Sequence, residues 1–245
     1  MTERLVLIPG LAGDKTMWAQ QLEELAPWRP LVTDVHMRHA DIPAMAEALL
    51  AEVPGALRLC GASMGGMIAM EAARQAPHRV TGLALLGTSA RPETETMREL
   101  RGAAVELFEQ GRLADVIEPN VRFAFHPRHA DDPVLVGRYL DFVYRAGAGQ
   151  LARQNRAVMD RPDARTHLPR LRCPVLVMCG EDDQLTPPEC SREIHALVPG
   201  AQLRLLPDCG HMLTMERPKA VNAALREWLG PAHPNPSPRR RPGPT

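Results

Sequence analysis

The sequence has 245 residues, of which 44% are hydrophobic, and its 29 basic residues balance its 29 acidic residues. A chain of this length can bury a substantial core, and zero formal net charge speaks against nucleic acid or an anionic membrane as the main partner. No apolar run approaches the roughly 18 residues that span a bilayer, and the first residues lack the pattern of a signal peptide. We therefore expect a cytoplasmic protein that binds neither nucleic acid nor membranes.

Apolar runs alternate with amphipathic segments along the chain, which predicts an α/β fold with a mostly parallel sheet. About six strands are predicted, at residues 4–8, 30–35, 56–60, 82–87, 174–179 and 202–206. The helices that cover them are predicted at residues 15–26, 41–53, 64–76, 187–198 and 217–229. In the second of these helices, Asp41 is expected to act as the N-cap.

Residues 90–170 interrupt this alternation with three amphipathic patterns, which include Leu107, Tyr139 and Val158. The sequence therefore divides into a core at 1–89 and 171–230 and a helical insertion between the fourth and fifth strands. The tail at 231–245 holds six prolines and three consecutive arginines, a composition that predicts disorder.

The most informative motif is the hexapeptide Gly61–Gly66, which reads Gly-Ala-Ser-Met-Gly-Gly. It follows a predicted strand and opens a predicted helix, the context in which Gly-x-Ser-x-Gly forms a nucleophile elbow. Ser63 is then the candidate nucleophile, on a turn so tight that a Cβ at Gly61 or Gly65 would clash. The backbone N–H of Met64, at the start of the helix, would point toward a developing oxyanion.

A candidate acid and a candidate base follow on loops at the ends of later strands. The apolar run at 175–179 leads into Asp182 and Asp183, and the strand at 202–206 leads into His211. The order Ser63, Asp183, His211 is that of the triad in α/β-hydrolases, with Asp182 as the competing acid. Between these loops Thr186, Pro187 and Glu189 have the pattern of a helix start.

From Leu5 to about Leu229 the chain resembles the α/β-hydrolase superfamily, in its small-cap branch of esterases, enol-lactonases and cofactor-free haloperoxidase-like enzymes. The resemblance implies that Asp183, the last residue of Gly-x-x-Asp, is the catalytic acid and that the Gly210-His211 pair carries the base. It also implies a second oxyanion donor, the N–H of Leu11, although Pro9 stands where relatives often have His. The helical insertion is expected to roof the active site.

Five residues beside these motifs are candidates for the substrate pocket: Trp18, Phe123, Phe125, Leu185 and Met212. Trp18 fits core packing equally well, and internal packing of the insertion is the favoured interpretation for the two phenylalanines. The five cysteines show no metal-binding spacing, and no histidine pair has an acid at metal-site spacing, so we expect no metal, no cofactor and no disulfide framework.

These features predict a serine hydrolase that cleaves a small or medium carboxylic ester or lactone. The same fold hosts other chemistries, so C–C bond hydrolysis or lysis and acyl transfer on the same triad are alternatives. A non-catalytic ligand-binding protein is a further alternative. The expected partner is a small-molecule substrate, and a homo-oligomer is compatible with the sequence.

Overall fold

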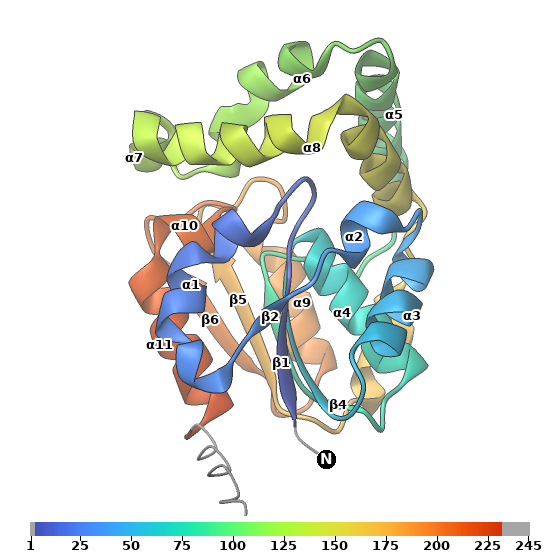
Figure 1. Cartoon of the computed structure of the whole chain (residues 1–245), viewed down its shortest axis with the longest axis vertical. Coiled ribbons are helices and arrows are strands. Elements are labelled where there is room, and N and C mark those ends of the chain that lie inside the picture. The colour runs from blue at the N-terminus through green and yellow to red at the C-terminus, as the bar shows by residue number, and fades with distance from the viewer. Residues whose placement is uncertain (1–2, 232–245) are drawn as a thin grey trace, which may run out of the picture.

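A single parallel sheet of six strands, in the order β2-β1-β3-β4-β5-β6, lies at the centre of the protein (Figure 1). The computed structural model describes residues 3–231, so the tail predicted at 231–245 lies outside the described residues except for its first position. The strands are β1 (Arg4–Ile8), β2 (Leu31–Val32), β3 (Leu57–Ala62), β4 (Val80–Leu86), β5 (Val175–Gly180) and β6 (Gln202–Leu206).

Helices cover both faces of the sheet, which is why its inner strands are apolar on both sides. One face packs against α3 (Ile42–Glu52), α4 (Met64–Gln75) and α9 (Pro188–Leu197). The other packs against α1 (Ala19–Glu24) and α11 (Pro218–Leu229). Alternate residues of β1 enter the two cores, Val6 and Ile8 on one side and Leu5 and Leu7 on the other. Two short helices, α2 (Val35–Arg38) and α10 (Leu213–Glu216), lie in loops beyond the strand ends.

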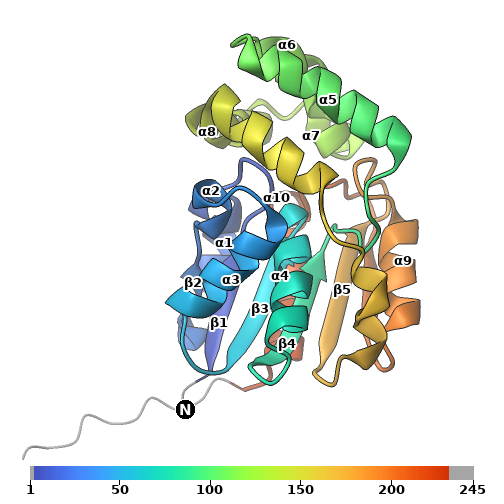
Figure 2. The same ribbon diagram turned by 90° about the vertical axis from the view of Figure 1, so that its right-hand side faces the viewer.

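The chain leaves the sheet between β4 and β5 to build a helical layer above the carboxyl ends of the strands (Figures 1 and 2). This layer, which we call the cap, contains α5 (Glu95–Glu109), α6 (Leu113–Asn120), α7 (Pro127–Ala130) and α8 (Pro133–Met159). The fold class, an α/β sheet with a helical insertion between the fourth and fifth strands, is therefore as predicted. None of the helices in residues 3–231 combines the length and the apolar character needed to cross a membrane.

Several local predictions were wrong in their boundaries. The second strand was predicted at 30–35 but has two residues, because it pairs only with β1, and Val35 already begins α2. The second and third amphipathic patterns of the insertion lie on either side of a kink in α8, where Gly147 leaves the helical conformation with φ 77° and ψ 165°, so their separation into two helical segments is as predicted. Helices α6 and α7 were not predicted.

Asp41 caps α3 as predicted, because its Oδ1 accepts a hydrogen bond of 2.8 Å from the N–H of Ala44. Replacing it with Ala leaves that N–H without its partner. We expect Asp41→Ala to lower the free energy of unfolding by about 1 kcal/mol, measured by urea denaturation. Asp41→Ser should retain most of the stability, and equal losses in both variants would contradict the capping role.

Candidate active site

Ser63 lies on the turn between β3 and α4 in a backbone conformation that side-chain-bearing residues rarely adopt, with φ 53° and ψ −118°. Two glycines make this turn sterically feasible. A Cβ on Gly61 would lie 2.2 Å from the carbonyl oxygen of Gly65, and a Cβ on Gly65 would lie 2.1 Å from that of Ile8. The motif therefore forms the tight elbow that its sequence predicts.

Neighbouring backbone and side-chain groups hold Ser63 in this conformation. Its N–H donates to the carbonyl oxygen of Leu86 at the end of β4, at 2.8 Å. Its own carbonyl oxygen accepts a hydrogen bond of 2.7 Å from Oγ1 of Thr88. Strain of this kind persists only where the surroundings determine it more strongly than the local preference, and here the end of β4 supplies that constraint.

His211 and Asp183 form a buried pair on the loops that follow β6 and β5. Nδ1 of His211 lies 3.0 Å from Oδ1 and 2.9 Å from Oδ2 of Asp183. Burial by itself lowers the pKa of His211, but the charge and hydrogen bond of Asp183 outweigh it and raise that pKa above its ordinary 6.5. Burial likewise opposes ionisation of Asp183, yet the pair with His211 and the donors around it leave its pKa below the ordinary value.

Asp183, and not its neighbour Asp182, is the acid that the loop directs at His211. The backbone N–H groups of Leu185 and Thr186 each donate to Oδ1 of Asp183 at 2.9 Å, and Oγ1 of Thr186 donates to Oδ2 at 2.9 Å. The carboxyl group of Asp182 is half-exposed and lies 3.6 Å from Nε2 of His126.

The helix start predicted at Thr186 and Pro187 differs in detail from the structure. Helix α9 begins at Pro188 without a side-chain cap. The Thr186 hydroxyl instead donates a hydrogen bond to Asp183. Thr186 therefore helps to position the acid and does not cap the helix.

Leu11 and Met64, whose N–H groups are the candidate oxyanion donors, line the same cavity as Ser63. Met64 is the first residue of α4, so its N–H has no partner within the helix. The loop that carries Leu11 is tied to the cap, because the N–H of Ala12 donates to Oε1 of the buried Gln154 at 2.7 Å.

A cavity of about 620 Å³ separates the strand ends from the cap, within the range of small-molecule sites. Ser63 and His211 line its floor, and its roof consists mostly of apolar side chains of the cap, among them Leu100, Phe108 and Phe142. Leu100 and Leu185 are at least half exposed and line the cavity where it meets solvent.

Three of the five predicted pocket residues, Phe123, Leu185 and Met212, line this cavity, whereas Trp18 and Phe125 do not. Trp18 is fully buried in the core between the sheet and the helices α1 and α11. Phe125 is fully buried and packs edge-on against Tyr139 of the cap, with ring centroids 5.5 Å apart. The pocket role is therefore wrong for these two residues: Trp18 follows the core alternative, and Phe125 follows the favoured interpretation of internal packing.

The segment that contains Phe125 nevertheless supports the site. The carbonyl oxygen of Ala124 accepts hydrogen bonds of 3.1 Å from the N–H groups of His211 and Met212. The cap therefore contacts the histidine loop as well as the Leu11 loop, through Ala124 and Gln154.

Sequence reasoning missed the polar residues that the cap contributes. Gln154 contacts the Leu11 loop, and Glu93, Arg101, Asn155 and Arg161 line the cavity. Polar residues inside amphipathic helices that are otherwise apolar toward the core are the signal that could have identified them. Within residues 3–231 no group of three or more His, Cys, Asp or Glu side chains has an arrangement that could hold a metal ion.

Comparison with known proteins agrees with this geometry. The chain is 30% identical over 241 residues to RutD from Escherichia coli O103:H2 (strain 12009 / EHEC), a protein described as a carbamate hydrolase without an established activity. The match covers 92% of this chain and 90% of that protein. An esterase from Thermogutta terrifontis, solved with malate bound, is 28% identical with a TM-score of 0.83, over 94% of this chain and 90% of that chain.

The same fold also occurs in a protein with lower sequence identity. The enol-lactonase from Burkholderia xenovorans LB400 is 21% identical with a TM-score of 0.83, over 94% of this chain and 92% of that chain. A family-wide sequence profile described as alpha/beta hydrolase fold matches residues 3–218. The resemblance on which the sequence analysis relied is thereby confirmed, and the chain belongs to the α/β-hydrolase family.

Proposed function

We propose that the protein is a serine hydrolase that cleaves a small or medium carboxylic ester or lactone through an acyl-enzyme on Ser63. The observation that carries this proposal is that the strained Ser63 lines one cavity with His211, which is paired with the buried Asp183, and with Leu11 and Met64, whose N–H groups are the candidate oxyanion donors. Each residue type then has a role that its surroundings support.

In the first half of the reaction Oγ of Ser63 attacks the substrate carbonyl carbon while Nε2 of His211 takes the hydroxyl proton. Asp183 holds the imidazole through Nδ1 and stabilises the imidazolium that forms. The N–H groups of Leu11 and Met64 donate to the tetrahedral oxyanion, at about 3 kcal/mol of transition-state stabilisation for each donor. The imidazolium then protonates the departing alcohol, which leaves the acyl group on Ser63.

In the second half water attacks the acyl-enzyme as His211 removes one of its protons. Collapse of the second tetrahedral intermediate breaks the bond to Oγ, and His211 returns the proton to Ser63. The carboxylic acid is released and the enzyme regains its starting state. The apolar roof of the cavity suits an acyl or alcohol part with an aliphatic or aromatic chain.

Carbamate hydrolysis is a second candidate, favoured by the 30% identity to RutD over 92% of this chain. A carbamate carries the same electrophilic carbonyl, so the same residues would act on it, with an amine nitrogen on one side of that carbonyl. Parallel assays on a p-nitrophenyl ester and on the corresponding p-nitrophenyl N-alkyl carbamate would rank the two substrates.

The central test is turnover of p-nitrophenyl esters of increasing acyl length by the wild type and by Ser63→Ala. We expect the variant to lose activity by a factor on the order of 10⁶, as when a serine nucleophile is removed from subtilisin. Ser89→Ala is the matched control, since Ser89 lines the same cavity and its hydroxyl accepts a hydrogen bond from the N–H of Arg91, and it should retain near-wild-type turnover. Equal activity of the wild type and Ser63→Ala would contradict the proposal.

The raised pKa of His211 predicts a pH dependence. His211 must be neutral to accept the proton of Ser63, so kcat/KM should fall with decreasing pH through a midpoint above 6.5. In Asp183→Asn the partner that raises the pKa is removed while the burial that lowers it stays. NMR titration of the His211 imidazole should therefore give a lower pKa in this variant than in the wild type.

Asp182→Asn is the matched control for this titration, because it removes the adjacent carboxylate and leaves the His211 pair intact. We expect it to keep the wild-type pKa of His211. A larger shift in Asp182→Asn than in Asp183→Asn would overturn the assignment of the acid.

Gln154 should act as a positioning residue for the oxyanion site, because it is the acceptor for the N–H of Ala12 next to Leu11. In Gln154→Leu we expect kcat to fall about 10- to 100-fold with little change in KM, since a misplaced donor weakens binding of the transition state more than of the substrate. The control is Gln150→Leu, which lies one turn earlier on α8 and also donates to the carbonyl oxygen of His36. A comparable fall in kcat for both variants would assign the effect to loss of the α8–His36 contact.

A further inference from the structure

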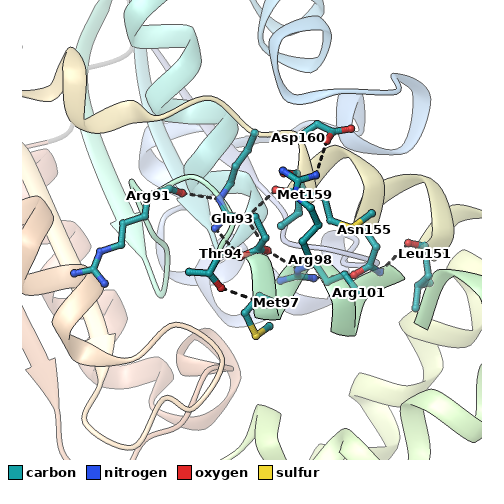
Figure 3. Close-up of polar contacts among 12 residues, drawn as sticks. Arg91, Glu93, Thr94, Met97, Arg98, Arg101, Leu151, Asn155, Met159 and Asp160 are labelled. Carbon is teal, nitrogen blue, oxygen red and sulfur yellow. Dashed lines mark hydrogen bonds and ion pairs between the residues drawn. The ribbon is translucent and has the colours of Figure 1, made fainter. Parts of the chain in front are cut away.

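One cluster of charged and polar side chains lies in the mostly apolar wall that the cap forms above Ser63. It consists of Glu93, just before α5, Arg101 on α5 and Asn155 on α8 (Figure 3), together with Arg161 just after α8. All four residues line the cavity. The Glu93 and Arg161 side chains are more than nine-tenths buried, and Arg101 is about one-quarter exposed. Burying a charge carries a large desolvation penalty, so a buried charged side chain is expected either to be fully paired or to have a function.

Arg161 is fully paired, and it donates hydrogen bonds to both carboxylate oxygens of Glu93. Its Nε donates to the carbonyl oxygen of Arg91 at 2.8 Å, and its Nη1 donates to Oε2 of Glu93 and to the carbonyl oxygen of Val158. Its Nη2 donates to Oε1 of Glu93 at 3.2 Å. Each guanidinium nitrogen of Arg161 therefore has a protein partner, so its role is to connect the two ends of the cap.

Arg101 is paired only in part. Its Nε donates to Oε2 of Glu93 and its Nη1 to Oδ1 of Asn155, both at 2.7 Å. The amide nitrogen of Asn155 is itself anchored to the carbonyl oxygen of Leu151 at 2.9 Å, which turns the amide oxygen toward Arg101. Within the described residues Nη2 of Arg101 has no hydrogen-bond partner, and it is not among the buried polar atoms. The guanidinium is thus fixed on two sides and open on the third.

The charges of the cluster do not cancel. Glu93 is a single carboxylate shared by two guanidinium groups, and the other partner of Arg101 is the neutral Asn155. Arg91, which also lines the cavity, pairs with Glu193. One positive charge therefore faces an apolar cavity without a counter-ion. It lies close enough to the catalytic residues that the charge of Arg101 acts to lower the pKa of His211.

We propose that Arg101 binds a carboxylate carried by the substrate at the end remote from the bond that is cleaved. This inference rests on the proposed ester or lactone hydrolysis and narrows its substrate class to acids that keep one free carboxylate, such as half-esters of dicarboxylic acids. An apolar spacer would lie along the roof of the cavity, while the carboxylate accepts a charge-assisted hydrogen bond from Nη2.

The fixed geometry of Arg101 favours this role over a purely structural one. The two hydrogen bonds to Glu93 and Asn155 restrict a side chain that otherwise has high rotamer entropy, so little ordering remains to be done when an anion binds. The low local dielectric of an apolar cavity strengthens the attraction to a carboxylate. Among the described residues, Glu93 is the one carboxylate within ion-pair distance of Arg101, and Glu93 is shared with Arg161.

The test compares two p-nitrophenyl esters of equal chain length. One is p-nitrophenyl hemiglutarate, which ends in a carboxylate, and the other is p-nitrophenyl pentanoate, which ends in a methyl group. In Arg101→Gln we expect kcat/KM for the hemiglutarate to fall about 10- to 100-fold, mainly through KM, as for loss of a charged hydrogen bond. The value for pentanoate should stay within about threefold, and Arg101→Lys should recover part of the loss.

Arg98→Gln is the matched control, because Arg98 lies one turn earlier on α5 and pairs with Asp160 and the carbonyl oxygen of Met159 outside the cavity (Figure 3). We expect it to leave the ratio of the two kcat/KM values unchanged. A similar loss for both esters in Arg101→Gln, or an unchanged ratio, would overturn the carboxylate subsite and leave Arg101 with a structural role.

A binding measurement separates this inference from the proposed reaction. Monomethyl glutarate is titrated calorimetrically into Ser63→Ala and into the double variant Ser63→Ala with Arg101→Gln. We expect the double variant to bind about 10- to 100-fold more weakly. Equal affinities would overturn the subsite even if the wild type hydrolyses esters. Arg101-dependent binding by a protein that turns over no ester would keep the subsite and overturn the proposed hydrolysis.

Discussion

The strained backbone of Ser63 is the constraint on which the rest of the site depends. Three features hold this residue at φ 53°. Its N–H donates to the carbonyl oxygen of Leu86 in β4, and the Thr88 hydroxyl donates to its carbonyl oxygen. Two glycines remove the Cβ atoms that would clash in the turn. The parallel sheet brings the ends of β1, β3, β5 and β6 to one edge, so the loops with Leu11, Ser63, Asp183 and His211 meet there. The sheet thus determines where the loops meet, and the loops carry the side chains of the candidate triad.

The cap contributes more than a roof. Ala124 holds the histidine loop and Gln154 holds the Leu11 loop, both by direct hydrogen bonds. Arg101 adds a positive charge to the apolar wall of the cavity. A change in cap packing should therefore alter kcat through the first two contacts and substrate preference through the third, which separates the effects of cap variants into two measurable classes.

The sequence predicted the sheet and the loops of the candidate site, because buried parallel strands are continuous apolar runs and the elbow requires glycines at fixed spacing. It left Trp18 open between pocket and core and favoured internal packing for both Phe123 and Phe125, of which only Phe125 is internal, because helical spacing does not tell whether a side chain faces a cavity or the core. The short β2 and the helices α6 and α7 depend on pairing at a sheet edge and on packing in the cap. Glu93, Arg101 and Asn155 are separated by up to 62 residues, and only the packing of α5 against α8 brings them together.

Covalent trapping of the nucleophile tests the central claim most directly. The wild type and His211→Ala are treated with an alkyl fluorophosphonate, and the adduct is located by intact-mass and peptide mass spectrometry. The account predicts one phosphonyl group for each wild-type chain, attached to Oγ of Ser63 with loss of fluoride, and labelling slowed by orders of magnitude in His211→Ala. Labelling at another residue, or none at Ser63 in the wild type, would contradict it.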